Sequence, residues 1–324
     1  MNIVFGPVIA PAAWAIGEAL LPPGFTIDIL SKDSTERIEQ LEGADFYMGF
    51  RGGLMHADYE HMDNLKLIQV LSAGYDGIDL KRLAEMRLPL SNNGGANSYA
   101  VAEHAIMLML AIYRQMPELH ALVKGGNWKS TKFGQEEEHE IAGKTVGIIG
   151  LGMVGKTLAR RLSGFEVKLL YTDPVRVSSD EAAKLNVSYR DLNDLMRESD
   201  IVTLHAPFDA TTHHMICDRT LALMKSDAIL INCARGELVD EAALYRALTA
   251  RTIWAAGIDV YDPEPPRPEN PLFTLPNIVL SPHAAGPTWE SWPKRFGNSY
   301  ANVQRVARGE APLWVVPELR ALLD

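Results

Sequence analysis

The stretch TVGIIGLGMVGK, residues 145–156, joins a short β-branched run to a glycine-rich turn and the start of a helical pattern. A strand, the spacing G-x-G-x-x-G and a helix in that order are typical of a dinucleotide-binding turn. Gly150 permits the tight turn, Gly152 lets the backbone approach a pyrophosphate, and Gly155 allows the helix to pack closely on the strand. Because the helix N-terminus supplies N–H donors to an anion, the stretch predicts cofactor contacts at Gly150, Gly152, Met153, Val154 and Gly155.

An acidic residue follows the glycine motif at the spacing expected for a ribose-binding carboxylate. Asp173 ends the next predicted strand, 21 residues after Gly152, and a spacing of about 20 residues is usual. Its carboxylate can accept hydrogen bonds from both ribose hydroxyls and would repel a 2′-phosphate. The sequence therefore predicts NAD, with NADP the less favoured cofactor. Arg176 could soften that repulsion, and a solvated surface arginine is the alternative interpretation.

The fold follows from the runs on either side of this motif. From Thr145 onward, nearly continuous apolar strands alternate with helical patterns: TVGIIG, KLLYTD, IVTLHA, AILINC, AAGIDV and NIVLS. This alternation is typical of a parallel sheet covered on both faces. Looser strands at 2–9, 26–30, 46–50, 66–72 and 88–91 indicate a second, smaller α/β layer. We expect two doubly wound, Rossmann-like or flavodoxin-like α/β domains with an active-site cleft between them. Residues 98–287 would form the NAD-binding domain, and 1–97 with 288–324 the substrate domain.

Length and composition favour a small-molecule enzyme over other classes. A chain of 324 residues and 35.8 kDa with 47% hydrophobic residues is expected to form about two globular domains. The formal charge of −10 argues against nucleic acid or an anionic membrane as partner. Cys217 and Cys233 form neither a disulfide framework nor a zinc motif, which predicts a reducing cytoplasm and no metal site. His213 and His214 are expected to project differently and to bind no metal. No stretch has the length and apolarity of a membrane span.

A long helix is predicted to run through VAEHAIMLMLAIYRQM, residues 101–116. This helical pattern is apolar on nearly every side, and the most apolar stretch is Ala100–Tyr113. Such a helix is expected to be buried between domains or subunits, and it predicts a homodimer interface together with an arm around Trp128. The segment 124–140 loses periodicity, and a solvated connector is an equally good interpretation of it. A later helix holding Trp289, Trp292 and Phe296 is expected to continue to about Arg308.

Three polar residues follow predicted strands, where ligands of parallel sheets bind. Arg235 follows AILINCA, Glu264 follows AAGIDV after a short turn, and His283 follows NIVLSP. Arg235 can bind a substrate carboxylate with two parallel hydrogen bonds and polarise a keto oxygen. His283 can protonate that oxygen, and Glu264 can orient the imidazole and favour its charged form. The three suit reduction of a 2-keto acid.

These motifs resemble the D-isomer-specific 2-hydroxyacid dehydrogenase family along essentially the whole chain. The resemblance is carried by GIIGLGMVGKTLA from Gly147, INCARGELVDEAAL from Ile231, GIDVYDPEP from Gly257 and SPHAAGPTWES from Ser281, with SAGYDGIDL and NSYAVAEHA upstream. It implies catalytic roles for Arg235, Glu264 and His283. It also implies cofactor contacts at His205, Pro207, Cys233 and Asp259, the last at the nicotinamide carboxamide. Ala73 and Gly74 would offer backbone N–H groups to the substrate carboxylate.

The resemblance leaves two functions and several residues open. The leading hypothesis is an NAD-dependent reductase of a small 2-keto acid such as glyoxylate, hydroxypyruvate or pyruvate, and the rival is an NADH-sensing protein similar to a corepressor, with little turnover. Glu264 is present where relatives that resemble formate dehydrogenase have Gln, which favours hydroxyacid chemistry. Arg51, Trp289 and Trp292 either line the substrate pocket or are ordinary surface and core residues.

Overall fold

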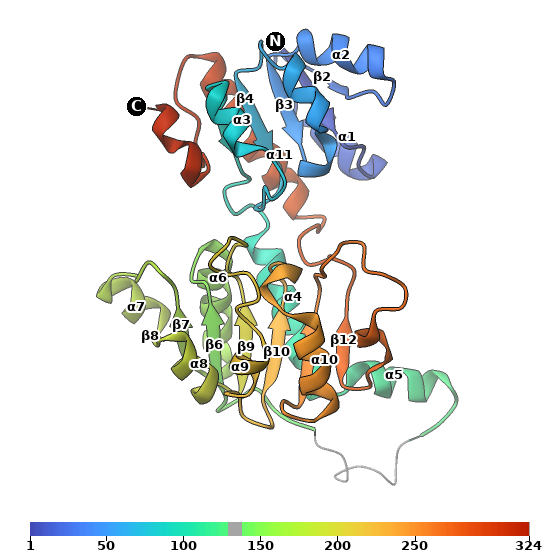
Figure 1. The fold of residues 1–324 in the computed structure, drawn as a ribbon, viewed down its shortest axis with the longest axis vertical. Coiled ribbons are helices and arrows are strands. Elements are labelled where there is room, and N and C mark those ends of the chain that lie inside the picture. The colour runs from blue at the N-terminus through green and yellow to red at the C-terminus, as the bar shows by residue number, and fades with distance from the viewer. Residues whose placement is uncertain (129–137, 324) are drawn as a thin grey trace. The chain divides into compact units, whose positions relative to one another are not determined.

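The computed structural model describes residues 1–128 and 138–323, and the chain divides into two compact units (Figure 1). One unit contains Met1–Asn97 together with the chain from Pro287 onward, and the other contains Ser98–Gly286. The expected connector at 124–140 includes residues 129–137, which lie outside the described part of the chain. Among the described residues, no helix has the length and apolarity to cross a membrane.

The unit that contains the N-terminus has a five-stranded sheet of order β2-β1-β3-β4-β5. All four pairings are parallel, and the order is the flavodoxin-like one. Its strands are β1 (Asn2–Gly6), β2 (Thr26–Ile29), β3 (Phe46–Gly49), β4 (Leu67–Val70) and β5 (Leu90–Ser91), and its first helices are α1 (Pro11–Ala19), α2 (Ser34–Glu42) and α3 (Leu80–Glu85).

The C-terminal residues complete this first unit. Helix α11 (Ser291–Ala307) packs on α1 and β4. The buried ring of Phe296 stacks on Phe5 with 6.0 Å between centroids. Val315 then pairs with Ser91 in an isolated antiparallel bridge. The expectation that Trp289 belongs to this helix is wrong: α11 begins at Ser291, and the Trp289 side chain is exposed before it.

The second unit has a seven-stranded sheet of order β12-β11-β10-β9-β6-β7-β8, and every pairing in it is parallel. The strands are β6 (Thr145–Ile149), β7 (Lys168–Thr172), β8 (Val187–Tyr189), β9 (Ile201–Leu204), β10 (Ile229–Asn232), β11 (Ala255–Ile258) and β12 (Ile278–Leu280). The helices are α4 (Ser98–Tyr113), α5 (Met116–Lys124), α6 (Met153–Leu162), α7 (Ser179–Leu185), α8 (Leu192–Glu198), α9 (Asp218–Leu221) and α10 (Glu241–Thr249). Strand order reverses between β6 and β9, the position at which doubly wound folds bind ligands.

Both faces of this sheet are covered, which explains its continuous apolar strands. In β10, Ile229 and Ile231 pack in the core that contains α4 and α6, whereas Leu230 packs in the core that contains α8, α9 and α10. Successive side chains of a strand point to opposite faces. In Figure 1, α4 passes behind the strands while α9 and α10 lie in front of them. The fold class predicted from the sequence is confirmed.

The apolar helical pattern after Asn97 forms two helices and not the single helix predicted. Helix α4 ends at Tyr113, and Gln115 takes a left-handed φ of 48° before α5 begins at Met116. Pro117 favours a new start, because proline fits the first turn of a helix and not its interior. In the single chain Met107 is 47% exposed, so burial of this helix between subunits stays a prediction.

Candidate active site

The glycine motif forms the turn between β6 and α6. Gly150 has a φ of +93°, and a Cβ there would lie 2.6 Å from the backbone nitrogen of Ala206, which follows β9. A Cβ on Gly155 would lie 2.2 Å from the Gly150 carbonyl oxygen. Only glycine fits either position without displacing backbone. The turn therefore brings the N-terminus of α6 to the point where strand order reverses.

The same turn has space for a ligand beside Gly152. A Cβ at Gly152 would meet no protein atom within 4 Å. Asp173 stands next to the turn: its Oδ2 accepts the N–H of Leu151 at 2.8 Å, and its Oδ1 accepts the N–H of Val175 at 2.8 Å. Open space at Gly152, a helix N-terminus and a carboxylate at the end of β7 fit the pyrophosphate and ribose of a dinucleotide.

Arg176 lies close to this carboxylate in sequence but is held by an aromatic ring. Its guanidinium carbon is 3.7 Å from the centroid of the Tyr189 ring, within the range of a cation–π interaction. Arg176 is therefore not only a solvated surface residue, because its guanidinium packs on the Tyr189 ring.

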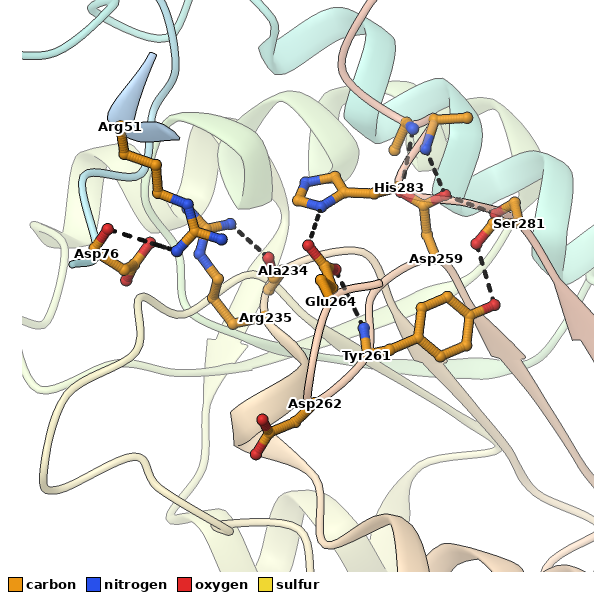
Figure 2. Close-up of polar contacts among 12 residues, drawn as sticks. Arg51, Asp76, Ala234, Arg235, Asp259, Tyr261, Asp262, Glu264, Ser281 and His283 are labelled. Carbon is orange, nitrogen blue, oxygen red and sulfur yellow. Dashed lines mark hydrogen bonds and ion pairs between the residues drawn. The ribbon is translucent and has the colours of Figure 1, made fainter. Parts of the chain in front are cut away.

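Arg235 follows β10 in a turn fixed by Asn232. The Asn232 amide donates to the Arg235 carbonyl at 2.8 Å, and its oxygen accepts the N–H of Ala234 at 3.0 Å. A Cβ on Gly236 would lie 2.1 Å from the Tyr261 carbonyl. The turn that carries Arg235 thus touches the loop after β11, and Figure 2 shows Arg235 near Glu264 and His283.

Glu264 and His283 form a hydrogen-bonded acid pair at the ends of β11 and β12. His283 Nδ1 lies 2.7 Å from Glu264 Oε2, and Glu264 Oε1 accepts the backbone N–H of Tyr261 at 3.1 Å (Figure 2). A carboxylate only accepts, so Nδ1 carries a hydrogen. The His283 side chain is 47% exposed. Its backbone has a φ of 53°, a strained conformation of the kind that clusters at functional sites.

Asp259 directly follows β11 and is completely buried. Its Oδ1 accepts the Ser281 hydroxyl at 2.6 Å and the Ala284 N–H at 2.8 Å, and its Oδ2 accepts the Ala285 N–H at 3.0 Å. The Asp259 carbonyl accepts the N–H of His283 at 2.7 Å. Asp259 therefore fixes the segment that carries His283, and Oδ2 retains one lone pair for a further donor such as a carboxamide.

Burial also sets the protonation state of two neighbouring groups. Burial and the nearby Asp259 charge raise the pKa of the Cys233 thiol well above its usual value, so this cysteine stays protonated and is not a nucleophile. Burial lowers the pKa of the His205 imidazole to about 4. His205 is therefore neutral at pH 7, with Nε2 at 3.0 Å from the Thr203 hydroxyl.

An apolar cavity of about 390 Å³ borders the acid pair within this unit. Tyr261, Phe273 and Leu280 line it together with three prolines, and Glu264 and His283 form part of its wall. Burial and the nearby carboxylates, Asp259 first, raise the pKa of the Tyr261 hydroxyl to about 12. That hydroxyl is therefore a hydrogen-bond donor at neutral pH.

The remaining candidates lie in the other unit or away from the acid pair. Ala73 and Gly74 follow β4 in a turn whose carbonyls accept from Asn92 at 3.3 Å and from Ser72 at 2.6 Å. In the same unit Arg51 donates to the Asp76 carbonyl at 3.4 Å. Trp292 packs edge-on against the Phe50 ring at 6.2 Å. Pro207 is exposed after β9.

The described residues contain no group of three or more His, Cys, Asp or Glu side chains placed to hold a metal ion. The expectation that His213 and His214 project differently is wrong. Their rings stack at 3.9 Å with an interplanar angle of 18°. His214 takes a left-handed φ of 48°, which turns the two neighbouring side chains to the same side.

Sequence reasoning missed three side chains that support the acid pair: Tyr261, Ser281 and His104. They lie in the motifs GIDVYDPEP, SPHAAGPTWES and NSYAVAEHA, respectively, but the family resemblance assigned no role to these three residues. The Tyr261 hydroxyl donates to the Ser281 carbonyl at 3.1 Å, and His104 Nε2 lies 2.9 Å from the Ser281 hydroxyl. A hydrogen-bonding residue just before a predicted catalytic histidine is the signal that could have found Ser281; no local signal points to Tyr261 or His104.

Comparison with known proteins identifies the family of this chain. Residues 106–285, more than half of the chain, match the NAD binding domain of D-isomer specific 2-hydroxyacid dehydrogenases. A glyoxylate reductase of Korarchaeum cryptofilum is 35% identical over 277 residues, which cover 85% of this chain and 83% of that protein. This chain belongs to the D-isomer specific 2-hydroxyacid dehydrogenase family. It is an oxidoreductase that acts on the CH–OH group of 2-hydroxy acids with a nicotinamide cofactor.

Two solved structures show the same fold with different forms of the cofactor. The D-isomer specific 2-hydroxyacid dehydrogenase of Lactobacillus delbrueckii ssp. bulgaricus, in its NAD complex, is 25% identical with a TM-score of 0.81 and covers 98% of this chain and 100% of its own. An acyclic imino acid reductase in complex with NADPH and D-Arg is 28% identical with a TM-score of 0.83, and the coverage is again 98% and 100%.

The open space at Gly152 yields a direct test of the cofactor site. We expect Gly152→Ala to keep the melting temperature within about 2 °C of wild type, because the added methyl meets no protein atom. The methyl would fill space that a pyrophosphate bound at this turn needs, so the Kd for NADH should rise by at least roughly tenfold. NADH fluorescence titration measures this. Gly164→Ala is the matched control, since a Cβ there is equally unobstructed, and equal NADH affinity in both variants would contradict the assignment.

Proposed function

We propose that this protein is an NAD-dependent reductase of small 2-keto acids, with Arg235, Glu264 and His283 as its catalytic residues. The observation that carries the proposal is the acid pair: His283 Nδ1 is 2.7 Å from the Glu264 carboxylate, and Arg235 follows the neighbouring strand β10. Arg235 follows β10 and His283 follows β12, the two strands that flank β11. A guanidinium and an imidazole at the same edge of the sheet match a substrate with a carboxylate next to a carbonyl.

Each residue has a defined part in the reaction. Arg235 binds the substrate carboxylate and polarises the keto oxygen. The chemistry that a nicotinamide cofactor supplies when bound is hydride transfer. His283 in its imidazolium form donates the Nε2 proton to the keto oxygen, and Glu264 stabilises the charged ring and holds its orientation. In the oxidation direction, neutral His283 accepts the hydroxyl proton at the same atom.

Residues of the second unit would hold the cofactor. The turn of Gly150, Gly152, Met153, Val154 and Gly155 would contact the pyrophosphate, and Asp173 the adenosine ribose. Asp259 Oδ2 would accept from the nicotinamide carboxamide, with His205, Pro207 and Cys233 lining the site. The Asp173 carboxylate would repel a 2′-phosphate, which is the ground for preferring NAD over NADP.

We assign the substrate role to the first unit, residues 1–97 with the C-terminal residues, and the cofactor role to the second. Backbone N–H groups of Ala73 and Gly74 would bind the substrate carboxylate. Arg51, which donates to the Asp76 carbonyl, is a candidate for substrates with a second anionic group.

A panel of 2-keto acids tests the proposed activity. Glyoxylate, hydroxypyruvate and pyruvate, with phosphorylated and dicarboxylic members, would each be incubated with enzyme and NADH while absorbance at the NADH band is followed. We expect turnover with at least one small member. Tight NADH binding without turnover would instead favour a redox-sensing binding protein.

Glu264 and His283 should act as one unit in turnover. Glu264→Gln keeps the shape of the side chain and removes the charge that holds and stabilises the His283 ring, so kcat for keto-acid reduction should fall roughly tenfold. His283→Ala should lower kcat by at least about a hundredfold. Steady-state kcat measured for both variants, with the Kd for NADH close to the wild-type value in each, tests this. A Glu264→Gln variant with wild-type kcat would disprove the pairing.

Asp173 should determine the choice between NAD and NADP. Asp173→Ala deletes both the ribose acceptor and the repulsive charge, so the Kd for NADH should rise roughly tenfold and the NAD-to-NADP ratio of kcat/KM should fall. Asp180→Ala, an exposed carboxylate on α7, is the control. A ratio that stays at the wild-type value would place the ribose elsewhere.

We also propose a cytoplasmic homodimer that uses α4 and the chain around Trp128. The support is the exposure of large apolar side chains along α4, α5 and the residues after them: Met107, Leu110, Met116, Val123 and Trp128, with Trp128 78% exposed. Both cysteines are free thiols, as in a reducing compartment.

Sedimentation equilibrium at micromolar concentration should give twice the chain mass of 35.8 kDa. Met107→Glu places a charge in the apolar surface and should shift the equilibrium toward the monomer. Leu20→Glu, at the end of α1 and 43% exposed, should leave the mass unchanged. A wild-type protein that sediments only as a monomer would exclude the dimer.

A further inference from the structure

Ser281 is the point at which three parts of the second unit meet beside the acid pair. Its hydroxyl contacts Asp259 Oδ1 at 2.6 Å and His104 Nε2 at 2.9 Å, and its carbonyl accepts the Tyr261 hydroxyl at 3.1 Å. These partners come from the end of β11, from helix α4 and from the loop after β11. His283 follows only two residues later. The position of Ser281 therefore constrains the backbone position from which the His283 side chain extends.

The contacts of Ser281 fix the direction of a hydrogen-bond chain. Asp259 acts as the acceptor for the N–H groups of Ala284 and Ala285, so the short contact with Ser281 uses the serine hydrogen. Ser281 Oγ must then accept from His104, whose Nε2 carries a hydrogen in this arrangement. The chain runs from His104 through Ser281 to Asp259, and it leaves the Ser281 hydroxyl a single orientation.

Tyr261 connects the two members of the acid pair. Its backbone N–H donates to Glu264 Oε1 at 3.1 Å, and its hydroxyl holds the Ser281 carbonyl. A carbonyl only accepts, so the tyrosine is the donor. Tyr261 thus bonds directly to the Glu264 carboxylate. It also bonds to Ser281, which lies two residues before His283 in the chain (Figure 2).

We infer that Tyr261 and His104 are positioning residues for proton donation: by fixing Ser281 from two sides, they hold the His283 imidazole on Glu264. The inference rests on the proposed function for its effect on turnover. The arrangement itself is independent of substrate. His283 is half exposed and its backbone is left-handed, so the ring depends on these contacts for a fixed direction.

Histidine ¹⁵N NMR on the full-length protein tests the arrangement without any substrate. His283→Gln assigns the His283 signals, and the wild type should show one tautomer with a hydrogen on Nδ1. Tyr261→Phe removes one hydroxyl, and His104→Leu removes the donor to Ser281; in both, we expect the His283 signals to move toward a mixture of tautomers. Ser281→Ala should do the same, and Ser281→Thr, which restores the hydroxyl, should recover the wild-type signal. Tyr245→Phe on α10 and His120→Gln on α5 are the matched controls.

Turnover is the second readout, measured with the best substrate of the keto-acid panel. In Tyr261→Phe we expect kcat to fall roughly tenfold, with the Kd for NADH within about twofold of wild type. A larger primary isotope effect with deuterated NADH should accompany the fall, because hydride transfer becomes more rate-limiting. His283 signals that stay at their wild-type positions in both Tyr261→Phe and His104→Leu would overturn the inference. A wild type that oxidises no NADH with any panel member would overturn the proposed function instead.

Discussion

The buried carboxylate of Asp259 is the constraint on which the rest of the site depends. A completely buried charge is costly unless hydrogen bonds compensate for the lost water. Asp259 obtains them from the segment Ser281–Ala285, through one hydroxyl and two backbone N–H groups. The segment can donate these hydrogen bonds to the carboxylate only by folding around it. In that fold His283 takes a left-handed backbone conformation, and its side chain lies partly in solvent. A stability requirement inside the unit thus produces an exposed imidazole with a defined direction.

The parallel sheet explains how residues distant in sequence reach one place. β10, β11 and β12 are neighbours in the sheet, so the turns after them carry Arg235, Glu264 and His283 to the same edge. The glycine motif follows β6 at that edge too, where strand order reverses. The glycine-rich turn and the Glu264–His283 pair therefore belong to one sheet. Close backbone contact, such as that of Gly236 with Tyr261, fixes the turn after β10 against the loop after β11.

Sequence patterns predicted those features of the fold and the site that short stretches of residues determine. The glycine spacing, the apolar strands and the polar residues after them follow from backbone geometry and burial over short stretches, and the fold class and family inferred from them are confirmed. The supporting contacts were missed because they are long-range: His104 and Ser281 are 177 residues apart. The stacking of His213 on His214 and the break at Gln115 were also missed, because both depend on single left-handed residues that no hydrophobic periodicity reveals.

We propose that His283, oriented by Glu264, gives a proton to the keto oxygen while Arg235 binds the neighbouring carboxylate. A crystal structure with NADH and oxamate, an analogue of a 2-keto acid, would show both contacts. We expect His283 Nε2 within about 3.2 Å of the amide oxygen of oxamate, which stands in for the keto oxygen, with Nδ1 still on Glu264. We also expect Arg235 bonded to the oxamate carboxylate. Oxamate bound with its oxygens on other donors, and His283 touching only Glu264, would contradict these roles.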